Sequence, residues 1–238
     1  MPASDAFIHS ITPSATNLFP GCDGGDPGTP QEPAIWIFGL EPGHSLTDQA
    51  KSPQSDSEYS VETQLKWPFN RNAFKLLAEI EGNSLKDYRG YALQHKIFEK
   101  GAHGYFKGNL YPVAVRSIKE WTQALVEKTG FQTKDEYQEW CRKNHFKHIR
   151  EWVSRHKPKL IIGCGTSFLN DFACAFLGEY SQPEKIQILG QGRVKNLYVF
   201  RGTPLVVVPH LSGGAGGLVG HESIIRAAEI ILNAHPTI

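Results

Sequence analysis

The sequence lacks the features of a secreted or membrane-spanning protein. Its 238 residues contain four cysteines, which form neither a Cys-x-x-Cys pair nor a regular disulfide framework. No stretch approaches the roughly 20 apolar residues that cross a bilayer, and the N-terminus has no basic segment followed by an apolar one. We therefore expect a soluble, cytoplasmic protein with reduced thiols.

An excess of charge of one sign is also missing. The formal net charge is +1, from 25 Lys and Arg against 24 Asp and Glu, so the basic balance typical of nucleic-acid-binding proteins is absent. A local basic strip can still serve an enzyme that searches DNA with low affinity. The ten histidines show no metalloprotease or zinc-finger spacing. We expect a monomer without a metal or another cofactor.

The composition is that of an ordinary folded protein, with 40% hydrophobic residues. The length suits one α/β domain with a single sizeable core. Residues 1–33 contain six prolines and a glycine cluster, which predicts an irregular N-terminal arm without a strand. Residues 34–238 form the predicted domain, and its polar segment 51–62 is predicted to be a surface loop or a mobile lid.

Four short apolar runs have the character of strands buried on both faces. They are residues 34–38, 108–113, 159–163 and 204–208. Between and after them lie segments with helical spacing: 69–80, 85–98, 115–127, 136–155, 168–177 and 219–233. The alternation predicts a three-layer α/β/α sandwich with a central, mainly parallel four-stranded sheet. Ligands of such sheets bind outside the carboxyl ends of the strands.

A carboxylate follows the first predicted strand, in Gly39-Leu40-Glu41-Pro42-Gly43-His44. At the ligand-binding edge, Glu41 is placed to stabilise positive charge that develops on a substrate. The alternative is a loop carboxylate of the helix-capping type.

An aromatic residue, Phe69, stands in the segment Trp67-Pro68-Phe69 at the start of a predicted helix. A base removed from a nucleic-acid stack loses about 1–3 kcal/mol of stacking energy unless a ring replaces its neighbours. Phe69 can provide that ring, or it can be a core residue of the helix.

An amide lies in the second run, in Gly108-Asn109-Leu110-Tyr111-Pro112. A single carboxamide can accept from a ring N–H and donate to a carbonyl, which suits the edge of uracil or thymine. The alternative is that Asn109 belongs to a turn that contains proline.

A histidine and a glycine-rich loop follow the last strand, in Val208-Pro209-His210-Leu211-Ser212-Gly213-Gly214. His210 can donate a hydrogen bond without being charged. The backbone amides of the loop suit phosphate. A histidine at a strand end and a plain flexible turn are the alternatives.

Together, the four segments resemble motifs of the uracil-DNA glycosylase superfamily, in the family's order and from residue 35 to about 220. The first is similar to Gly-x-(Asp or Asn)-Pro-(Tyr or Gly), and the last to His-Pro-Ser. The segment that starts at Pro68 is similar to the Pro-Phe-x-x-x-Ala-x-x-Leu-Leu stretch of the iron-sulfur branch. Glu41 departs from the usual Asp or Asn, and Leu211 replaces Pro. The cluster cysteines of the iron-sulfur branch are missing, so we expect no cluster.

The resemblance implies a monofunctional DNA glycosylase that flips a base and leaves an abasic site. Glu41 would hold or activate the attacking water and His210 would stabilise the departing base. Phe69, Asn109, Gly43, His44 and Leu40 would bind the base, and Leu211, Ser212, Gly213 and Gly214 would contact DNA, with Leu211 or a neighbour as a wedge.

Glycine at position 43, where uracil-specific members carry Tyr, predicts tolerance of thymine or other C5-substituted pyrimidines. The biological role would be repair or phage defence. Two other functions stay open: a non-catalytic DNA- or nucleotide-binding module of the same fold, and a small-molecule nucleosidase.

Overall fold

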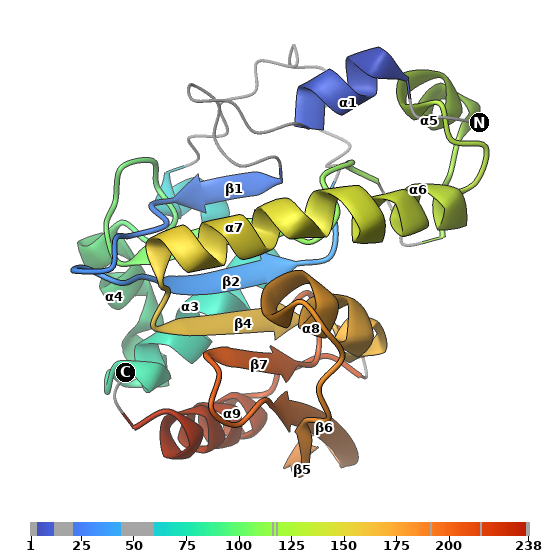
Figure 1. Cartoon of the computed structure of the whole chain (residues 1–238). Helices are drawn as coiled ribbons and strands as arrows, with labels where there is room; N and C mark the ends of the chain where they lie inside the picture. Colours follow the sequence, from blue (N-terminus) through green and yellow to red (C-terminus); the bar gives the residue numbers. More distant parts are fainter. Residues whose placement is uncertain are drawn as a thin grey trace.

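The protein is an α/β structure in which helices cover both faces of one mixed sheet (Figure 1). The computed structural model describes residues 4–11, 21–43, 60–115, 117, 119–190, 192–214 and 216–236. The predicted lid, 51–62, lies outside these residues except for its last three positions.

The centre of the sheet is formed by four parallel strands, as predicted. They are β3 (Tyr105–Asn109), β2 (Ile35–Gly39), β4 (Leu160–Cys164) and β7 (Leu205–Val208), side by side in that order. Every residue of these strands is buried, which explains the continuous apolar sequences of β2, β4 and β7. The third strand begins three residues before the predicted start and ends at Asn109, so Leu110 to Val113 lie beyond the strand.

The prediction of four strands is wrong in number, because three antiparallel strands extend the sheet to seven among the residues that the structure describes. The full order is β1-β3-β2-β4-β7-β6-β5. A hairpin of β5 (Glu184–Gly190) and β6 (Arg193–Val199) lies beside β7. These strands are only half covered, so they alternate polar and apolar residues instead of forming an apolar run.

The prediction of an arm without a strand is also wrong. The arm contains helix α1 (Asp5–Ile11) and strand β1 (Cys22–Gly25), which pairs with β3. A Cβ atom on Gly24 would lie 2.2 Å from the Phe98 carbonyl oxygen, and one on Gly25 would lie 2.0 Å from that of Tyr105. The glycines that suggested a loop are therefore required for close backbone approach in a strand.

Two helical layers enclose the sheet (Figure 1). Helices α3, α4 and α9 cover one face, and α6, α7 and α8 cover the other, with α1 and α5 beside α6. The helices are α2 (Val61–Gln64), α3 (Pro68–Ile80), α4 (Tyr88–His95), α5 (Gln123–Thr129), α6 (Lys134–Trp140), α7 (Phe146–His156), α8 (Leu169–Leu177) and α9 (His221–Ala234), with short turns η2 (Leu85–Asp87) and η4 (Thr166–Phe168).

Two predicted helices differ in detail from the observed ones. The segment 115–127 becomes helical only at Gln123, because Thr122 provides the N-terminal cap by accepting a hydrogen bond from the Leu125 amide. The long segment 136–155 is interrupted by a π-helical turn, η3 (Cys141–His145), between α6 and α7. Within the described ranges, no helix is long and apolar enough to span a membrane.

Candidate functional site

Three of the predicted site segments meet at the carboxyl edge of the parallel sheet. Asn109 ends β3 and pairs in register with Gly39 at the end of β2, while His210 follows β7 by two residues. Helix α3 runs back along the sheet, so Phe69 in its first turn reaches the same edge. Pro68 occupies the first helical turn, where its missing N–H costs no hydrogen bond.

Phe69 and His210 come together directly. Their ring centroids lie 5.5 Å apart with an interplanar angle of 57°. Both side chains are partly exposed, so the pair offers ring surface at the edge of the core.

The hydrogen bonds of His210 define its tautomer. The Ser212 backbone N–H donates to Nδ1 at 3.2 Å, and the Ser212 hydroxyl lies 2.6 Å from the same atom. Because a backbone N–H can only donate, Nδ1 is unprotonated. Burial lowers the pKa of His210, which favours the neutral ring with its proton on Nε2. His210 is therefore a neutral hydrogen-bond donor.

Asn109 is buried, and the N-terminal arm orients it. Its backbone N–H donates to the Gly21 carbonyl at 2.8 Å, and its side-chain Nδ2 donates to the same oxygen at 3.3 Å. Asn109 Oδ1 lies 2.7 Å from the position that a Cβ atom of Gly39 would occupy. Glycine at position 39 thus leaves room for the amide.

Glu41 lies after β2 as predicted, but its carboxylate forms an ion pair on the α6 side. Lys134 Nζ lies 2.8 Å from both oxygens and donates a hydrogen bond to Oε2. The exposed fractions are 6% for the Glu41 side chain and 11% for Lys134. Burial raises the pKa of Glu41, although Lys134 opposes this. Among the described contacts, none joins Glu41 to Phe69, Asn109 or His210.

The structure places two other predicted binding residues of the first motif, Leu40 and Gly43, in different environments. The Leu40 side chain is buried in the core on the α6–α8 face and packs near Gly165, so it does not offer a binding surface. Gly43 forms an isolated bridge with Val115, and a Cβ atom there would meet nothing within 4 Å. His44 lies outside the described residues.

The loop after His210 corrects one prediction. Leu211 is fully buried in the core, and its carbonyl accepts a hydrogen bond from Asn72 Nδ2 at 2.7 Å. It therefore cannot act as a DNA wedge from this position. Ser212 and Gly214 are exposed and Gly213 is partly exposed. Gly213 and Gly214 have positive φ values of 117° and 82°, which favour glycine.

Sequence reasoning missed two charged residues in this site, Lys107 and Asp23. Lys107 Nζ lies 2.5 Å from Asp23 Oδ2 and 5.4 Å from the centroid of the Phe69 ring. Strand alternation places Lys107 on the same face of β3 as Asn109. A lysine inside a run of buried strand residues was a usable signal, whereas Asp23 is placed only by the pairing of β1.

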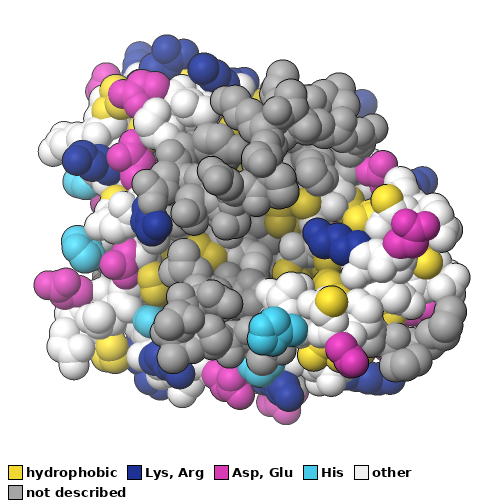
Figure 2. Space-filling view, turned by 90° about the horizontal axis from the view of Figure 1, so that it is seen from above, with side chains coloured by type: hydrophobic (Ala, Val, Ile, Leu, Met, Phe, Trp, Pro, Cys, Tyr) yellow, Lys and Arg dark blue, Asp and Glu magenta, His cyan; other side chains and the backbone are white. Residues whose placement is uncertain are grey.

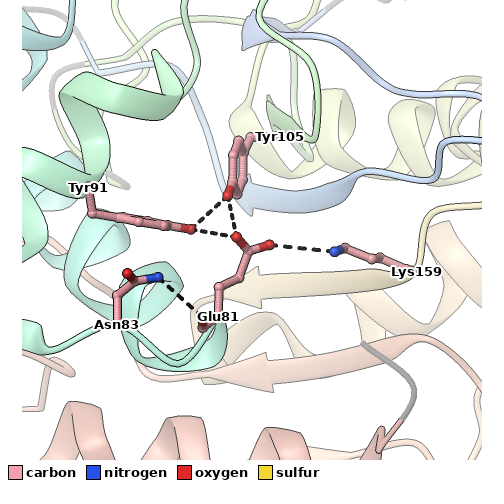
Figure 3. Close-up of polar contacts among 5 residues, drawn as sticks. All are labelled: Glu81, Asn83, Tyr91, Tyr105 and Lys159. Carbon is pink, nitrogen blue, oxygen red and sulfur yellow. Dashed lines mark hydrogen bonds and ion pairs between the residues drawn. The ribbon is translucent and has the colours of Figure 1, made fainter.

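A second polar cluster lies at the opposite, amino edge of the sheet (Figure 3). Glu81 Oε2 accepts hydrogen bonds from the phenols of Tyr105 at 2.6 Å and Tyr91 at 3.0 Å, and the two phenol oxygens lie 2.7 Å apart. Lys159 Nζ lies 3.5 Å from Glu81 Oε1. Burial is the main cause of the raised pKa of both tyrosines, so they stay neutral.

The surface charges are mixed. On the face shown in Figure 2, Lys and Arg side chains are spread among Asp and Glu side chains. The described residues of this face therefore show no single strip of positive charge.

No protein-family model matches the chain, and no curated protein matches it significantly. Among the described residues, no group of three or more His, Cys, Asp or Glu side chains is arranged to hold a metal ion.

Proposed function

We propose that the carboxyl edge of the sheet binds a flipped nucleobase and that the protein is a monofunctional DNA glycosylase. The observation that supports this most is the approach of the Phe69 and His210 rings, with Asn109 at the end of the neighbouring parallel strand. A stacking ring, a neutral donor and an amide are the groups that recognise an unstacked base.

Each group has a role in the proposed reaction. Phe69 stacks on the extruded base, and Asn109 reads its hydrogen-bonding edge. His210 Nε2–H donates to a base oxygen as negative charge builds on the leaving group. Glu41 stabilises the positive sugar or activates water once its carboxylate separates from Lys134, whose Nζ lies 2.8 Å from both oxygens.

The test is an assay for abasic sites in oligonucleotides that carry uracil, thymine or 5-hydroxymethyluracil. Alkaline treatment converts each abasic site into a strand break that gel electrophoresis detects. We expect excision by the wild type and a loss of about 10²–10³-fold for His210→Ala, the magnitude typical of removing one stabilising donor. His95→Ala is the matched control, because His95 contacts Tyr91 at the opposite edge. Excision of no base by the wild type would overturn the proposal.

The buried ion pair of Glu41 with Lys134 supports a second candidate, a non-catalytic base-binding module. This candidate would be favoured over the glycosylase if the protein bound duplexes with a modified base more tightly than unmodified duplexes but formed no abasic sites in them.

A further inference from the structure

The carboxyl edge contains an ion pair that none of the proposed roles uses. Lys107 Nζ and Asp23 Oδ2 lie 2.5 Å apart, and the exposed fractions of the side chains are 10% and 29%. Removing the Lys107 ammonium from water beside a partly exposed carboxylate costs free energy. The pair therefore needs an explanation beyond the stability of the strand.

The backbone of β1 aims Asp23 at this lysine. Cys22 pairs with Gly108 and Gly24 pairs with Lys107, so Asp23 is the extra residue of a β-bulge. Bulges next to binding sites commonly redirect a side chain. The residue before β1 supplies the Gly21 carbonyl that accepts from Asn109, so both Lys107 and Asn109 have partners in the segment of residues 21–23.

Lys107 is also positioned relative to the proposed base. Lys107 and Asn109 point to the same face of β3 and are about 7 Å apart along the strand, which is roughly the span of a pyrimidine with a small substituent. Lys107 Nζ lies 5.4 Å from the centre of the Phe69 ring on which that base would stack. A substituent next to the edge read by Asn109 would thus reach the ion pair.

Resting on the proposed function, we infer that Lys107 and Asp23 are specificity-determining residues that select a base with a neutral, polar exocyclic substituent. Lys107 donates to the substituent and Asp23 accepts from it, as a hydroxyl group requires. A methyl group would cover the ion pair without replacing its lost hydration. A carboxylate substituent would gain from Lys107 but would face Asp23.

The experiment measures binding of pyrimidines that differ only in this substituent. Duplexes carry thymine, 5-hydroxymethyluracil or 5-carboxyuracil on a 2′-fluorinated sugar that resists hydrolysis, and anisotropy gives the dissociation constants. We expect 5-hydroxymethyluracil to bind on the order of tenfold more tightly than thymine, and more tightly than 5-carboxyuracil. Thymine binding at least as tightly, or 5-carboxyuracil binding most tightly, overturns the inference.

A double variant tests whether the ion pair causes the preference. Lys107→Met with Asp23→Asn removes both charges without leaving one unpaired, and we expect the preference to fall below about twofold. The control is Arg201→Met with Glu184→Gln, which removes a remote exposed ion pair and should keep the preference. A full preference in a folded double variant overturns the inference, and the wild-type measurement is decisive even if that variant does not fold.

Two further measurements separate this inference from the proposed function. If the wild type excises bases but shows no preference for the hydroxymethyl group, the inference fails and the glycosylase stands. Free 5-hydroxymethyluracil and thymine are therefore also titrated by NMR. If free 5-hydroxymethyluracil binds more tightly than free thymine but no duplex is bound and no base is excised, the proposed glycosylase fails and the base-selective site stands. No preference in either form overturns the inference.

Discussion

Each edge of the sheet contains a lysine–carboxylate pair, but the polar groups around the two pairs are organised differently. At the amino edge, Glu81 receives two phenol hydrogen bonds and lies beside Lys159, so both of its oxygens have protein partners (Figure 3). At the carboxyl edge, His210 Nε2 has no partner among the described residues, and the Phe69 ring is partly exposed. A closed network fixes helices to strands, whereas groups with unused hydrogen-bonding capacity are available to a ligand.

The largest expected effect is the loss of excision when Asn109 at the carboxyl edge is replaced, compared with Asn83 at the amino edge. Asn109→Ala should reduce excision by about 10³-fold or more, because a base edge would lose its matched amide. Asn109→Asp should shift the preference toward cytosine-type bases, since the new carboxylate accepts from an exocyclic amine. Rates are measured on oligonucleotides that carry uracil or cytosine.

The control for Asn109 is Asn83→Ala. Asn83 donates to the backbone carbonyl of Glu81 at the amino edge, and its loss should leave excision unchanged. Wild-type rates and base preference in both Asn109 variants would make Asn109 structural.

The second prediction concerns Glu41. Glu41→Gln should reduce excision by about 10²-fold or more if the carboxylate acts on the sugar or on water. It also leaves Lys134 buried without its counter-charge, which destabilises a fold by about 3–5 kcal/mol. Adding Lys134→Met should recover much of that stability.

The double variant distinguishes catalysis from structure at Glu41. Denaturant unfolding and excision are measured on the wild type and on both variants. If the double variant regains stability but its excision rate stays low, Glu41 takes part in the reaction. Excision that returns together with stability would reduce Glu41 to a structural ion pair.

The third prediction tests the hydrogen-bond network around Glu81 at the amino edge. Glu81→Gln should lower the free energy of unfolding by about 1–3 kcal/mol, since one partly buried oxygen acceptor is replaced by an amide donor beside two phenols. Tyr91→Phe should cost about 1 kcal/mol. Urea unfolding gives both values, and excision per folded molecule should stay at the wild-type level. A change in base preference would show that the two edges are coupled.

The smallest expected effect is at Gly43. Gly43→Tyr should lower excision of thymine relative to uracil by about tenfold, because an added ring meets a C5 substituent. A Cβ atom at this position has open space, and the backbone is outside the left-handed region, so the variant should fold. Gly43→Ala is the control and should keep the wild-type ratio. An unchanged ratio in active Gly43→Tyr would place residue 43 away from the C5 edge.

The sequence alone was sufficient for the parallel core and for much of its carboxyl edge. Runs such as 34–38 are apolar because both faces of the strand are buried, and this requirement is visible without coordinates. The order of strands and loops then placed His210 at the carboxyl edge, whereas Asn109, near the start of the predicted run 108–113, lies at that edge because β3 ends at Asn109. The helical spacing placed Phe69 correctly on a helix, but it left open whether the ring belonged to the core.

Only the tertiary structure decided which charges face which groups. Glu41 pairs with Lys134, 93 positions away in the chain, and Asp23 reaches Lys107 through an antiparallel strand rich in glycine. Such pairs depend on strand order, on the side of the sheet and on a single bulged residue, and none of these leaves a periodic pattern in the sequence. Local patterns report burial, whereas the identity of a charged side chain's partner is determined by long-range packing.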